Sequence, residues 1–328
     1  MAFKFKVQKA EREKIAVKIA LMGPSSAGKT MSSLKMATGM VGRLKETNNL
    51  GDTNGRILVA NTEGSRGRYY ANEFDYDIVD LEPPYNPEMF VDLINYAVDE
   101  KYTVLIIDSS SEEWTGKGGC LELQQQAGGT YQAWSRITPR HNKFIDALTT
   151  SPIHIIATMR GKDQYEVEKD EKGRVNVKKL GVGIQQRDGM EYYFTCTFNL
   201  DNVDHMARCE KDNTHIFDSE GRVLLDESYG SRLADWANSS EIESHDAIKF
   251  RENKDAVKHE GFTELEDTIN AIASLAKALT EAGVDKKVIA DTVKDHFVVN
   301  GKPSANYNAI KDVNTAKEVQ AALENLHK

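Results

Sequence analysis

The residues able to do chemistry begin with a phosphate-binding pattern, G-x-x-x-x-G-K-[ST], which the chain fits at Gly23, Pro24, Ser25, Ser26, Ala27, Gly28, Lys29 and Thr30. Such a loop wraps a polyphosphate with its own backbone N–H groups, and glycine stands where a side chain would collide. Lys29 supplies a positive charge for the β- and γ-phosphates, and the Thr30 hydroxyl can ligate Mg²⁺. The pattern predicts a site for a nucleoside triphosphate, ATP or GTP.

Hydrolysis of that nucleotide also needs an acid that holds the Mg²⁺ shell. Asp108 fits this role because it ends the apolar run 103–107, where a rigid strand would present its carboxylate beside the phosphate loop. Ser109 follows it and is able to support the water shell of the metal. The alternative is that Asp108 only caps the next helix.

A water-activating base is the next requirement, and Glu63 is the first choice. It follows the apolar segment 56–61, and functional groups of parallel sheets gather at the carboxyl ends of strands. Glu112 and Glu113, just past Asp108, are competitors for this role. The alternative is that Glu63 is only an acid in an exposed loop.

A third group of side chains follows the apolar segment 153–157, at Thr158 and Arg160. A hydroxyl and a cation at a strand's carboxyl end would face the same crevice, which predicts that they sense the γ-phosphate. Arg160 has two alternative roles, which are to bind a DNA phosphate or to pair with an acid.

The elements that must position these residues alternate along the chain. Helices are expected at 31–44, 87–98 and 121–148, between apolar strands at 15–22, 56–61, 77–81, 103–108 and 153–158. This alternation predicts an α/β core with a mainly parallel sheet that is covered on both faces. Strands at shorter spacing, at 192–200, 205–209 and 222–225, are expected to add to one sheet edge in antiparallel fashion.

Four segments make up the expected domain organisation. Residues 1–14 form a basic arm, read as an edge strand, and residues 15–238 form the ATPase core. Residues 239–262 are a linker or a solvated helix, and residues 263–328 form a small helical C-terminal domain with apolar residues at helical spacing. Within the core, residues 161–188 are polar, charged and glycine-rich, which predicts a long functional or mobile loop.

Composition excludes several classes of protein. The chain has 328 residues and a net charge of −9, which argues against wholesale coating of nucleic acid but allows a local basic path. Three cysteines without short paired spacing exclude an obvious zinc knuckle or disulfide framework. Since neither a signal segment nor a membrane-spanning apolar run is visible, a cytoplasmic protein without a membrane partner is expected.

Taken together, the motifs resemble the RecA-like recombinase ATPases, and more closely the phage RecA-like ATPases of the single-strand annealing type. The resemblance covers about residues 12–237. It is carried by the phosphate loop and by the segments Asn61-Thr62-Glu63, Tyr70-Ala71, Val104–Ser109, Ile153–Arg160 and Gln185–Tyr192. It implies a RecA-like P-loop core that binds ATP and Mg²⁺.

The resemblance also assigns roles to single residues. It favours Glu63 over Glu112 as the base, and it implies that Tyr70 stacks on adenine. The segment 161–188 would engage single-stranded DNA through Lys162, Lys178, Lys179 and Arg187. Such ATPases take cations from a neighbouring subunit, and the candidates here are Arg208 and Lys211. Asn213 stands where related chains often carry a second cation.

The expected function is therefore an ATP-dependent, single-stranded-DNA-binding recombination protein of a phage or prophage, promoting annealing or strand exchange in the host cytoplasm. It would assemble as a ring or filament of identical subunits, with a single-strand-binding protein as a further partner. The alternative is a nucleotide-gated loader or regulator, or a ring translocase, that acts with replication proteins. A small-molecule kinase ranks lowest, because segment 161–188 is too acidic and irregular for a substrate lid.

Overall fold

A computed structural model describes residues 7, 9–169, 175–257, 262–299 and 301–327 of the chain. Side chains are described outside residues 162–182 and 255–264. The chain divides into two compact units, Met1–Glu252 and Asn253–Lys328.

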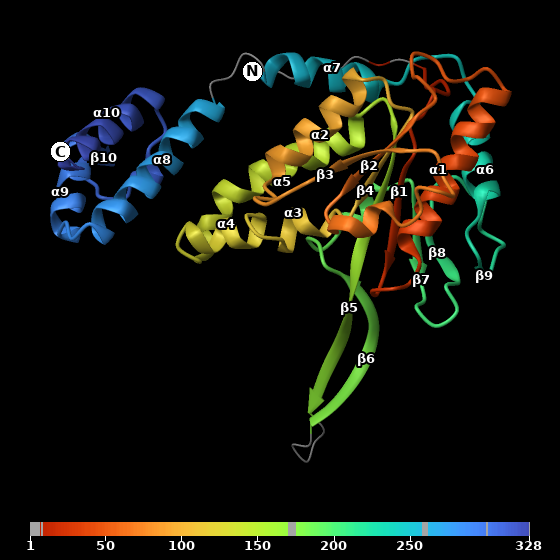
Figure 1. Ribbon diagram of the computed structural model, residues 1–328, viewed down its shortest axis with the longest axis horizontal. Helices are drawn as coiled ribbons and strands as arrows, with labels where there is room; N and C mark the ends of the chain where they lie inside the picture. Colours follow the sequence, from red (N-terminus) through yellow and green to blue (C-terminus); the bar gives the residue numbers. More distant parts are fainter. Residues whose placement is uncertain (1–6, 8, 170–174, 258–261, 300, 328) are drawn as a thin grey trace. The chain divides into compact units, whose positions relative to one another are not determined.

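The first unit is built on a central sheet with the strand order β3-β2-β4-β5-β1-β7-β8-β9 (Figure 1). Neighbouring strands are parallel from β3 to β7, while β8 and β9 are added antiparallel. The predicted α/β class with a mostly parallel sheet is confirmed. The strands are β1 (Lys18–Gly23), β2 (Ile57–Asn61), β3 (Asp77–Asp80), β4 (Val104–Asp108), β5 (His154–Lys169), β7 (Cys196–Leu200), β8 (Ala207–Asp212) and β9 (Arg222–Val223).

One edge of the sheet differs from the prediction. The segment 192–200 was expected to join antiparallel, but β7 pairs with β1 in parallel and begins only at Cys196. Tyr192 and Tyr193 belong instead to a short 3-10 helix, η3 (Met190–Tyr193). Periodicity alone does not reveal strand direction, which depends on how the connection crosses the sheet.

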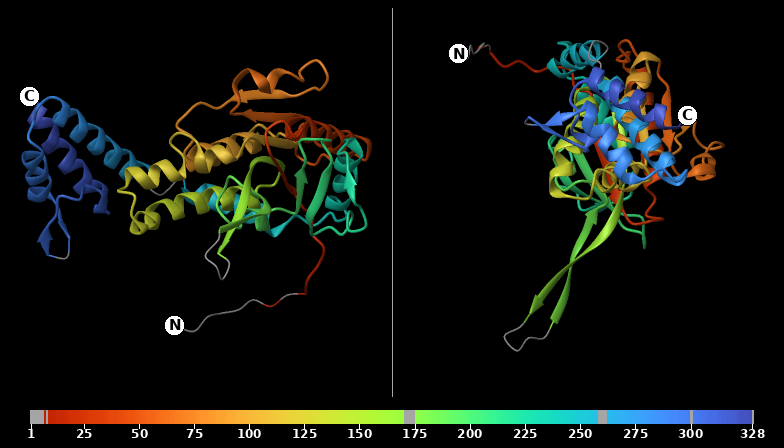
Figure 2. Two further views of the ribbon diagram at one scale, coloured as in Figure 1. Left: turned by 90° about the horizontal axis from the view of Figure 1, so that it is seen from below. Right: turned by 90° about the vertical axis from the view of Figure 1, so that its left-hand side faces the viewer.

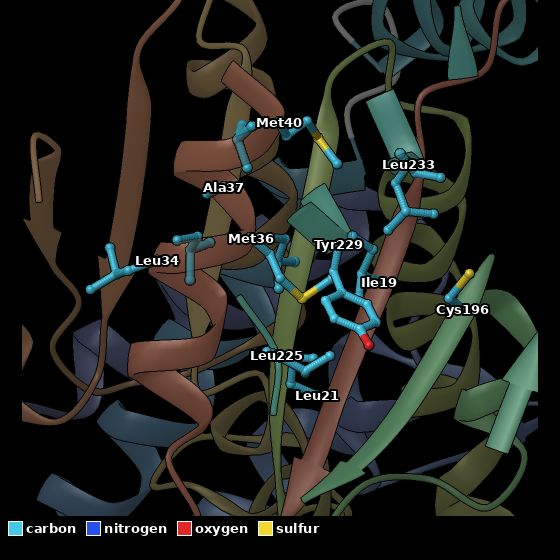
Figure 3. Close-up of a cluster of buried hydrophobic side chains, with 14 of the residues drawn as sticks. Ile19, Leu21, Leu34, Met36, Ala37, Met40, Cys196, Leu225, Tyr229 and Leu233 are labelled. Atoms are coloured by element: carbon cyan, nitrogen blue, oxygen red, sulfur yellow. The ribbon is translucent and has the colours of Figure 1, made fainter. Parts of the chain in front are cut away.

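Helices cover both faces of the sheet, as the continuous apolar strands require. On one face lie α1 (Lys29–Glu46) and α6 (Glu227–Ala237), and on the other lie α2 (Pro87–Asp99) and α5 (Trp134–Thr150) (Figure 1). The sheet separates two hydrophobic cores, one on each face, and successive residues of β1 belong alternately to one and the other. Ile19 and Leu21 pack with α1, whereas Ala20 and Met22 pack with α2 and α5. Figure 3 shows the first of these cores, where side chains of α1 and α6 meet those of β1 and β7.

The helix expected at 121–148 is divided in two. A short helix, α4 (Cys120–Gln126), ends before Gly128 and Gly129, which adopt φ of 103° and 66°. Such positive φ values favour glycine, so this pair terminates α4 and lets the chain turn before α5 begins. Pro139 lies inside α5.

Helices α1 and α6 approach each other unusually closely through glycine. A Cβ added at Gly39 would lie 1.8 Å from the carbonyl oxygen of Glu227, and one added at Gly230 would lie 1.8 Å from that of Met36. Both obstacles are backbone atoms of the facing helix, so neither is able to rotate away. The two helices therefore depend on glycine at these positions.

We expect Gly39→Ala to lower the free energy of unfolding by about 1–3 kcal/mol, because the methyl group forces the helices apart. Gly42 lies on the same helix with no atom near an added Cβ. Gly42→Ala is thus a matched control that should stabilise the fold by up to about 1 kcal/mol through helix propensity. Urea unfolding of both variants provides the measurement, and equal effects at the two positions would contradict the packing argument.

A buried lysine lies at the end of the sheet opposite the phosphate loop. The Lys18 side chain is 3% exposed, and its Nζ donates hydrogen bonds of 2.8 Å to the carbonyl oxygens of Ser151 and Ile153. Burial lowers the pKa of Lys18 to about 7, against a smaller opposing effect of Asp246. The neighbouring His154 accepts a hydrogen bond from the Val17 N–H at Nδ1, and burial lowers its pKa to about 3.

The buried Lys18 should make the free energy of unfolding depend on pH. Since its pKa is near 7 when folded and 10.5 when unfolded, the unfolded chain binds more protons between these values, and stability rises with pH there. Below pH 7 Lys18 is protonated in both the folded and the unfolded chain. The full free-energy penalty of burying its charge then lowers the stability of the fold. We expect the stability of the wild type relative to Lys18→Met to rise by about 1 kcal/mol per pH unit from pH 7.5 to 9.5. Urea titrations of both proteins at each pH test this, and a pH-independent difference would refute it.

The segment predicted as a long loop, residues 161–188, forms a β-hairpin over most of its length. Strand β5 continues to Lys169, and β6 (Val175–Ile184) pairs with it antiparallel, from Gly161 opposite Ile184 to Lys169 opposite Val175. The hairpin extends beyond the carboxyl end of the sheet (Figure 2). The loop prediction was wrong because apolar residues do alternate with polar ones along β6, at Val175, Val177, Leu180, Val182 and Ile184, with one shift of phase.

The basic arm is not an edge strand in the part of residues 1–14 that the structure describes. Residues 7 and 9–17 have no regular secondary structure. The Arg12 guanidinium lies 4.2 Å from the ring centroid of Trp236 and donates to the Trp236 carbonyl oxygen. The Lys14 N–H donates to the Ile242 carbonyl oxygen, so the arm runs along residues 236–242. Beyond these, α7 (His245–Val257) occupies the segment predicted as a linker or solvated helix, and Phe250 of this helix is buried.

The described residues of the second unit include three α-helices, two short 3-10 helices and a small hairpin. The helices are α8 (Phe262–Glu281), α9 (Lys286–His296) and α10 (Val313–Glu324), and β10 (Val298–Val299) pairs antiparallel with β11 (Lys302–Pro303). These elements enclose a hydrophobic cluster of their own that includes Ile272, Leu279, Val293, Val319 and Leu323. Among the helices in the described part of the chain, none has the length and apolar character needed to cross a membrane.

Candidate nucleotide site

The phosphate loop joins the end of β1 to the start of α1. Gly23 ends the strand, where an added Cβ would lie 2.5 Å from the Leu200 carbonyl oxygen, and Gly28 precedes the helix with φ of 88°. Both positions therefore need glycine, one for close approach and one for conformation. The loop delivers the N-terminus of α1, with its unpaired N–H groups, to the place where phosphate would bind.

Lys29 has its Nζ within the loop itself. It donates to the carbonyl oxygens of Gly23 at 2.9 Å and Pro24 at 2.7 Å. Burial lowers the pKa of Lys29, and the carboxylates of Asp108 and Glu63 oppose this shift. The ammonium therefore lies close to both acids, as expected of a cation that binds the β- and γ-phosphates.

Asp108 ends β4 and contacts the phosphate loop directly. The Thr30 hydroxyl donates to Asp108 Oδ2 at 2.5 Å, and the Thr158 hydroxyl donates to Asp108 Oδ1 at 2.5 Å. Burial raises the pKa of Asp108, while these two hydrogen bonds act in the opposite direction. The strands bring the three residues together because β4 and β1 both border β5.

The hydroxyl and carboxylate oxygens fit a magnesium ion. Mg²⁺ binds hard oxygen ligands and in nucleotide sites uses one or two protein oxygens together with phosphate. Thr30 Oγ1 and Asp108 Oδ2 lie side by side at the phosphate loop and would hold the ion directly or through its water shell. The ion, when bound, would neutralise charge on the β- and γ-phosphate oxygens.

Thr158 has a different contact from the one predicted for a γ-phosphate sensor. Its side chain is fully buried and its hydroxyl is directed at Asp108. Its carbonyl oxygen accepts two hydrogen bonds from Ser110, one from the backbone N–H and one from the hydroxyl. Thr158 therefore orients the acid that faces the metal, and Arg160 is the better candidate for contact with the γ-phosphate.

Arg160 bridges the two acids that compete for the role of base. Its Nη2 lies 3.3 Å from Glu63 Oε1, and its Nη1 lies 2.5 Å from Glu112 Oε1 in α3 (Ser111–Thr115). The Glu112 side chain is 12% exposed and that of Glu63 is 27% exposed. Of these two acids, Glu63 also influences the pKa values of Lys29 and Asp108 through its charge. Glu63 is therefore the stronger candidate for the base, and Glu112 holds the arginine.

Glu113, the third candidate for the base, lies away from this crevice. Its carboxylate is completely buried and is hydrogen-bonded to Cys120, His141 and Gln186. A carboxylate enclosed in this way has no access to an attacking water. The prediction that Glu113 competes for this role is therefore wrong.

Sequence reasoning missed two side chains that position the site. Asn61 Oδ1 accepts a hydrogen bond from the Glu63 N–H, while its Nδ2 donates to the Gly64 carbonyl and to Asp80, so it shapes the turn that carries Glu63. Ser111 Oγ accepts a hydrogen bond from the Arg160 N–H. Asn61 was visible as a polar residue at the end of an apolar strand, a signal that Asp108 shares. Ser111 offered no such signal.

The remaining predicted residues lie outside this cluster of contacts. Tyr70 is half-buried and packs against the hydrophobic core that contains the buried side chains of α1. Its stacking on adenine stays a prediction. Lys211 Nζ donates to the carbonyl oxygens of Tyr192 and Phe194, whereas Arg208 is exposed on β8. Arg208 is therefore the stronger candidate for a cation that reaches a neighbouring subunit.

The DNA-binding candidates are associated with the hairpin. Lys162 is on β5, Lys178 and Lys179 are on β6, and their side chains are outside the described set. Arg187 follows the hairpin, half-buried, with Nη1 3.5 Å from Asn142 Oδ1.

The parallel sheet, the phosphate loop and the acid at the end of β4 define a P-loop NTPase-type ATPase. A sequence model of the AAA domain family matches residues 15–225, and the chain belongs to this family. The matched region contains all the residues of the nucleotide site described above. No curated protein matches the chain.

Proposed function

We propose that this chain is an ATPase whose nucleotide cycle is coupled to single-stranded DNA, in recombination by annealing or strand exchange. The observation that carries the proposal is the continuity of β5. The same strand holds Thr158 and Arg160 at the nucleotide site and then extends into the hairpin (Figure 1). A change at Arg160 when the γ-phosphate is bound or released would therefore reach the hairpin through one unbroken strand.

The charge along the hairpin supports a nucleic-acid partner. Strand β6 carries Lys178 and Lys179 and no acidic residue, whereas the acids Asp163, Glu166 and Glu168 are on the β5 side. Lysines that meet phosphates provide the salt-dependent part of affinity for nucleic acid.

Aromatic residues at the base of the hairpin also support it. Tyr192 and Tyr193 are 74% and 50% exposed, close in sequence to Arg187. Exposed aromatic rings beside cations offer stacking surfaces for unpaired bases. The combination favours a single strand over duplex DNA, whose bases are already stacked.

The direct test removes the hairpin without disturbing the sheet. Because Gly161 pairs with Ile184, residues 162–183 can be replaced by an Asn-Gly turn that joins the two paired positions. We expect the wild type to hydrolyse ATP faster when single-stranded DNA is added, and the shortened protein to hydrolyse at the DNA-independent rate with or without DNA. ATP turnover that ignores DNA in the wild type, or stimulation that persists in the shortened protein, would refute the proposal.

A paired substitution tests the lysines. The binding constant for single-stranded DNA falls with salt, and each phosphate contact contributes about 0.7 to the slope of log K against log salt concentration. If both lysines contact phosphate, the double variant Lys178→Ala/Lys179→Ala should have a slope that is smaller in magnitude by about 1.4. The matched control is Lys286→Ala/Lys287→Ala, another adjacent lysine pair, exposed at the start of α9. A larger effect of the control pair would place the DNA contact on the second unit instead.

The second unit supports a rival function, that of a nucleotide-gated loader or regulator of replication proteins. Residues Asn253–Lys328 form a compact unit with a hydrophobic cluster of its own, which supports a function that belongs to this unit itself. Removing residues 253–328 distinguishes the two functions. If the shortened protein still hydrolyses ATP faster in the presence of single-stranded DNA, the result supports the recombination function. If it still binds DNA but no longer binds replication proteins, the result supports the loader or regulator.

A further inference from the structure

Three buried side chains with different metal-binding atoms lie together where α3, α4 and α5 meet. Glu113 is on α3, Cys120 begins α4 and His141 is on α5. They are 0%, 0% and 2% exposed, and their oxygen, sulfur and nitrogen atoms all lie within 4.8 Å of one another. We propose that the Glu113–Cys120–His141 cluster binds a divalent transition-metal ion of the zinc class.

The separations between these atoms suit a single ion. Cys120 Sγ lies 3.1 Å from Glu113 Oε1, and His141 Nδ1 lies 3.0 Å from the same oxygen. Zinc binds sulfur at about 2.3 Å and nitrogen or oxygen at about 2.0–2.2 Å, which places the ligand atoms of a tetrahedral site roughly 3.3–3.6 Å apart. The side chains would have to open by only a few tenths of an ångström to admit the ion.

The chemistry of the ligands selects the class of metal. A thiolate and an imidazole suit zinc and related transition metals, whereas Mg²⁺ and Ca²⁺ prefer oxygen ligands alone. Three protein ligands are a common set for zinc in proteins. On binding, three metal–ligand bonds form and the thiol S–H bond breaks, and its proton passes to solvent. The proton that His141 Nδ1 donates to Glu113 must also leave this nitrogen, which ligates through its lone pair while Nε2 carries the ring proton.

A tight glycine segment holds Cys120 against Glu113. A Cβ added at Gly119 would lie 2.7 Å from the carbonyl oxygens of both Glu112 and Glu113, and one added at Gly118 would lie 2.3 Å from Pro84 Cβ. These positions therefore need glycine, which lets the chain turn tightly between α3 and α4. The turn places Cys120 Sγ 3.1 Å from Glu113 Oε1.

A glutamine outside the cluster orients the carboxylate. Gln186 Nε2 donates to Glu113 Oε2 at 3.2 Å and to the Ser110 carbonyl oxygen at 3.1 Å. Side chains that orient a ligand in this way typically contribute about 10- to 100-fold to metal affinity. Gln186 also follows β6, so a bound metal would tie three helices to the base of the hairpin.

The test uses the full-length protein, treated with a chelator and then titrated with Zn²⁺ against a chromophoric competitor. We expect one Zn²⁺ per chain, and with Co²⁺ a thiolate-to-cobalt charge-transfer band. Cys120→Ser should abolish the band and weaken Zn²⁺ binding by more than about 100-fold, and Gln186→Leu should weaken it by about 10- to 100-fold. Cys196→Ser is the matched control because Cys196 is also buried and also contacts a carboxylate, that of Asp212.

Two further measurements on the wild type keep the result independent of whether variants fold. In a urea concentration that opens the fold enough for the reagent to reach the buried thiols, Zn²⁺ should slow alkylation of Cys120 while leaving Cys196 and Cys209 unchanged, as read by mass spectrometry. It should also change tryptophan fluorescence, because the Trp114 ring lies 5.1 Å from that of His141. The proposal is overturned if the wild type binds no Zn²⁺ in competition, if Cys120→Ser binds as well as wild type, or if Zn²⁺ leaves Cys120 unprotected.

Discussion

Lys29→Ala is expected to reduce ATP turnover by about 100- to 1,000-fold, the usual cost of removing one group that stabilises charge in the transition state. The Lys29 ammonium lies among the Gly23 and Pro24 carbonyls, and it is close enough to Asp108 and Glu63 for their charges to affect its pKa. An alanine leaves the phosphate loop intact but without this cation. Steady-state release of inorganic phosphate, measured together with the affinity for a fluorescent ATP analogue, gives the size of the effect.

Lys45→Ala is the matched control for this substitution. Lys45 lies on the same helix in its last turn and is exposed, so the chemical change is identical and the distance from the phosphate loop is large. We expect its turnover to stay within about twofold of wild type, because a surface substitution away from the site changes little. Equal losses in the two variants would show that general charge on α1, rather than a contact with phosphate, is responsible.

Glu63→Gln is expected to lower the turnover number by about 100- to 10,000-fold, the range for removal of a general base. The amide has the same shape, so the hydrogen bond between the Glu63 N–H and Asn61 should persist and ATP should still bind. Turnover measured with saturating ATP, together with the affinity for a fluorescent ATP analogue, tests both expectations. A variant that no longer binds ATP, or one that turns it over at the wild-type rate, would contradict the assignment of Glu63 as the base.

Glu112→Gln distinguishes the two acids that Arg160 joins. Because Glu112 Oε1 pairs with Arg160 Nη1, its loss should loosen the arginine without removing the base. We expect a smaller loss of turnover than in Glu63→Gln, measured as phosphate release with saturating ATP. If Glu112→Gln abolishes hydrolysis and Glu63→Gln retains it, the assignment of the two residues is reversed.

Much of the nucleotide site could be predicted from the sequence because its parts are local. The phosphate loop is a continuous pattern, and Asp108 is recognisable as an acid at the end of an apolar strand. Parallel strands bring such ends to one edge, so the proximity of Asp108 to Thr30 follows from the fold class. What the pattern does not contain is side-chain direction, and so Thr158 turned out to contact the acid.

The features that escaped prediction depend on contacts between distant segments. Glu113 and His141 are 28 residues apart and Gln186 lies a further 45 residues along the chain, so nothing in their spacing indicates a shared buried cluster. The hairpin escaped for a different reason. Its alternating apolar residues on β6 were present in the sequence, but the high charge of β5 and a shift of register between Gln164 and Tyr165 concealed the period.

The continuity of β5 has a mechanical consequence. From Arg160 to Lys169 the strand spans about 30 Å at roughly 3.3 Å per residue, and its partner β6 stiffens it along this length. The strand would then act as a lever arm whose length follows from the rise per residue. If β5 rotated by about 5° at Arg160, the end of the strand at Lys169 would move by about 3 Å. The hairpin would thus amplify a small angular change at Arg160 into a displacement comparable to the spacing of stacked bases.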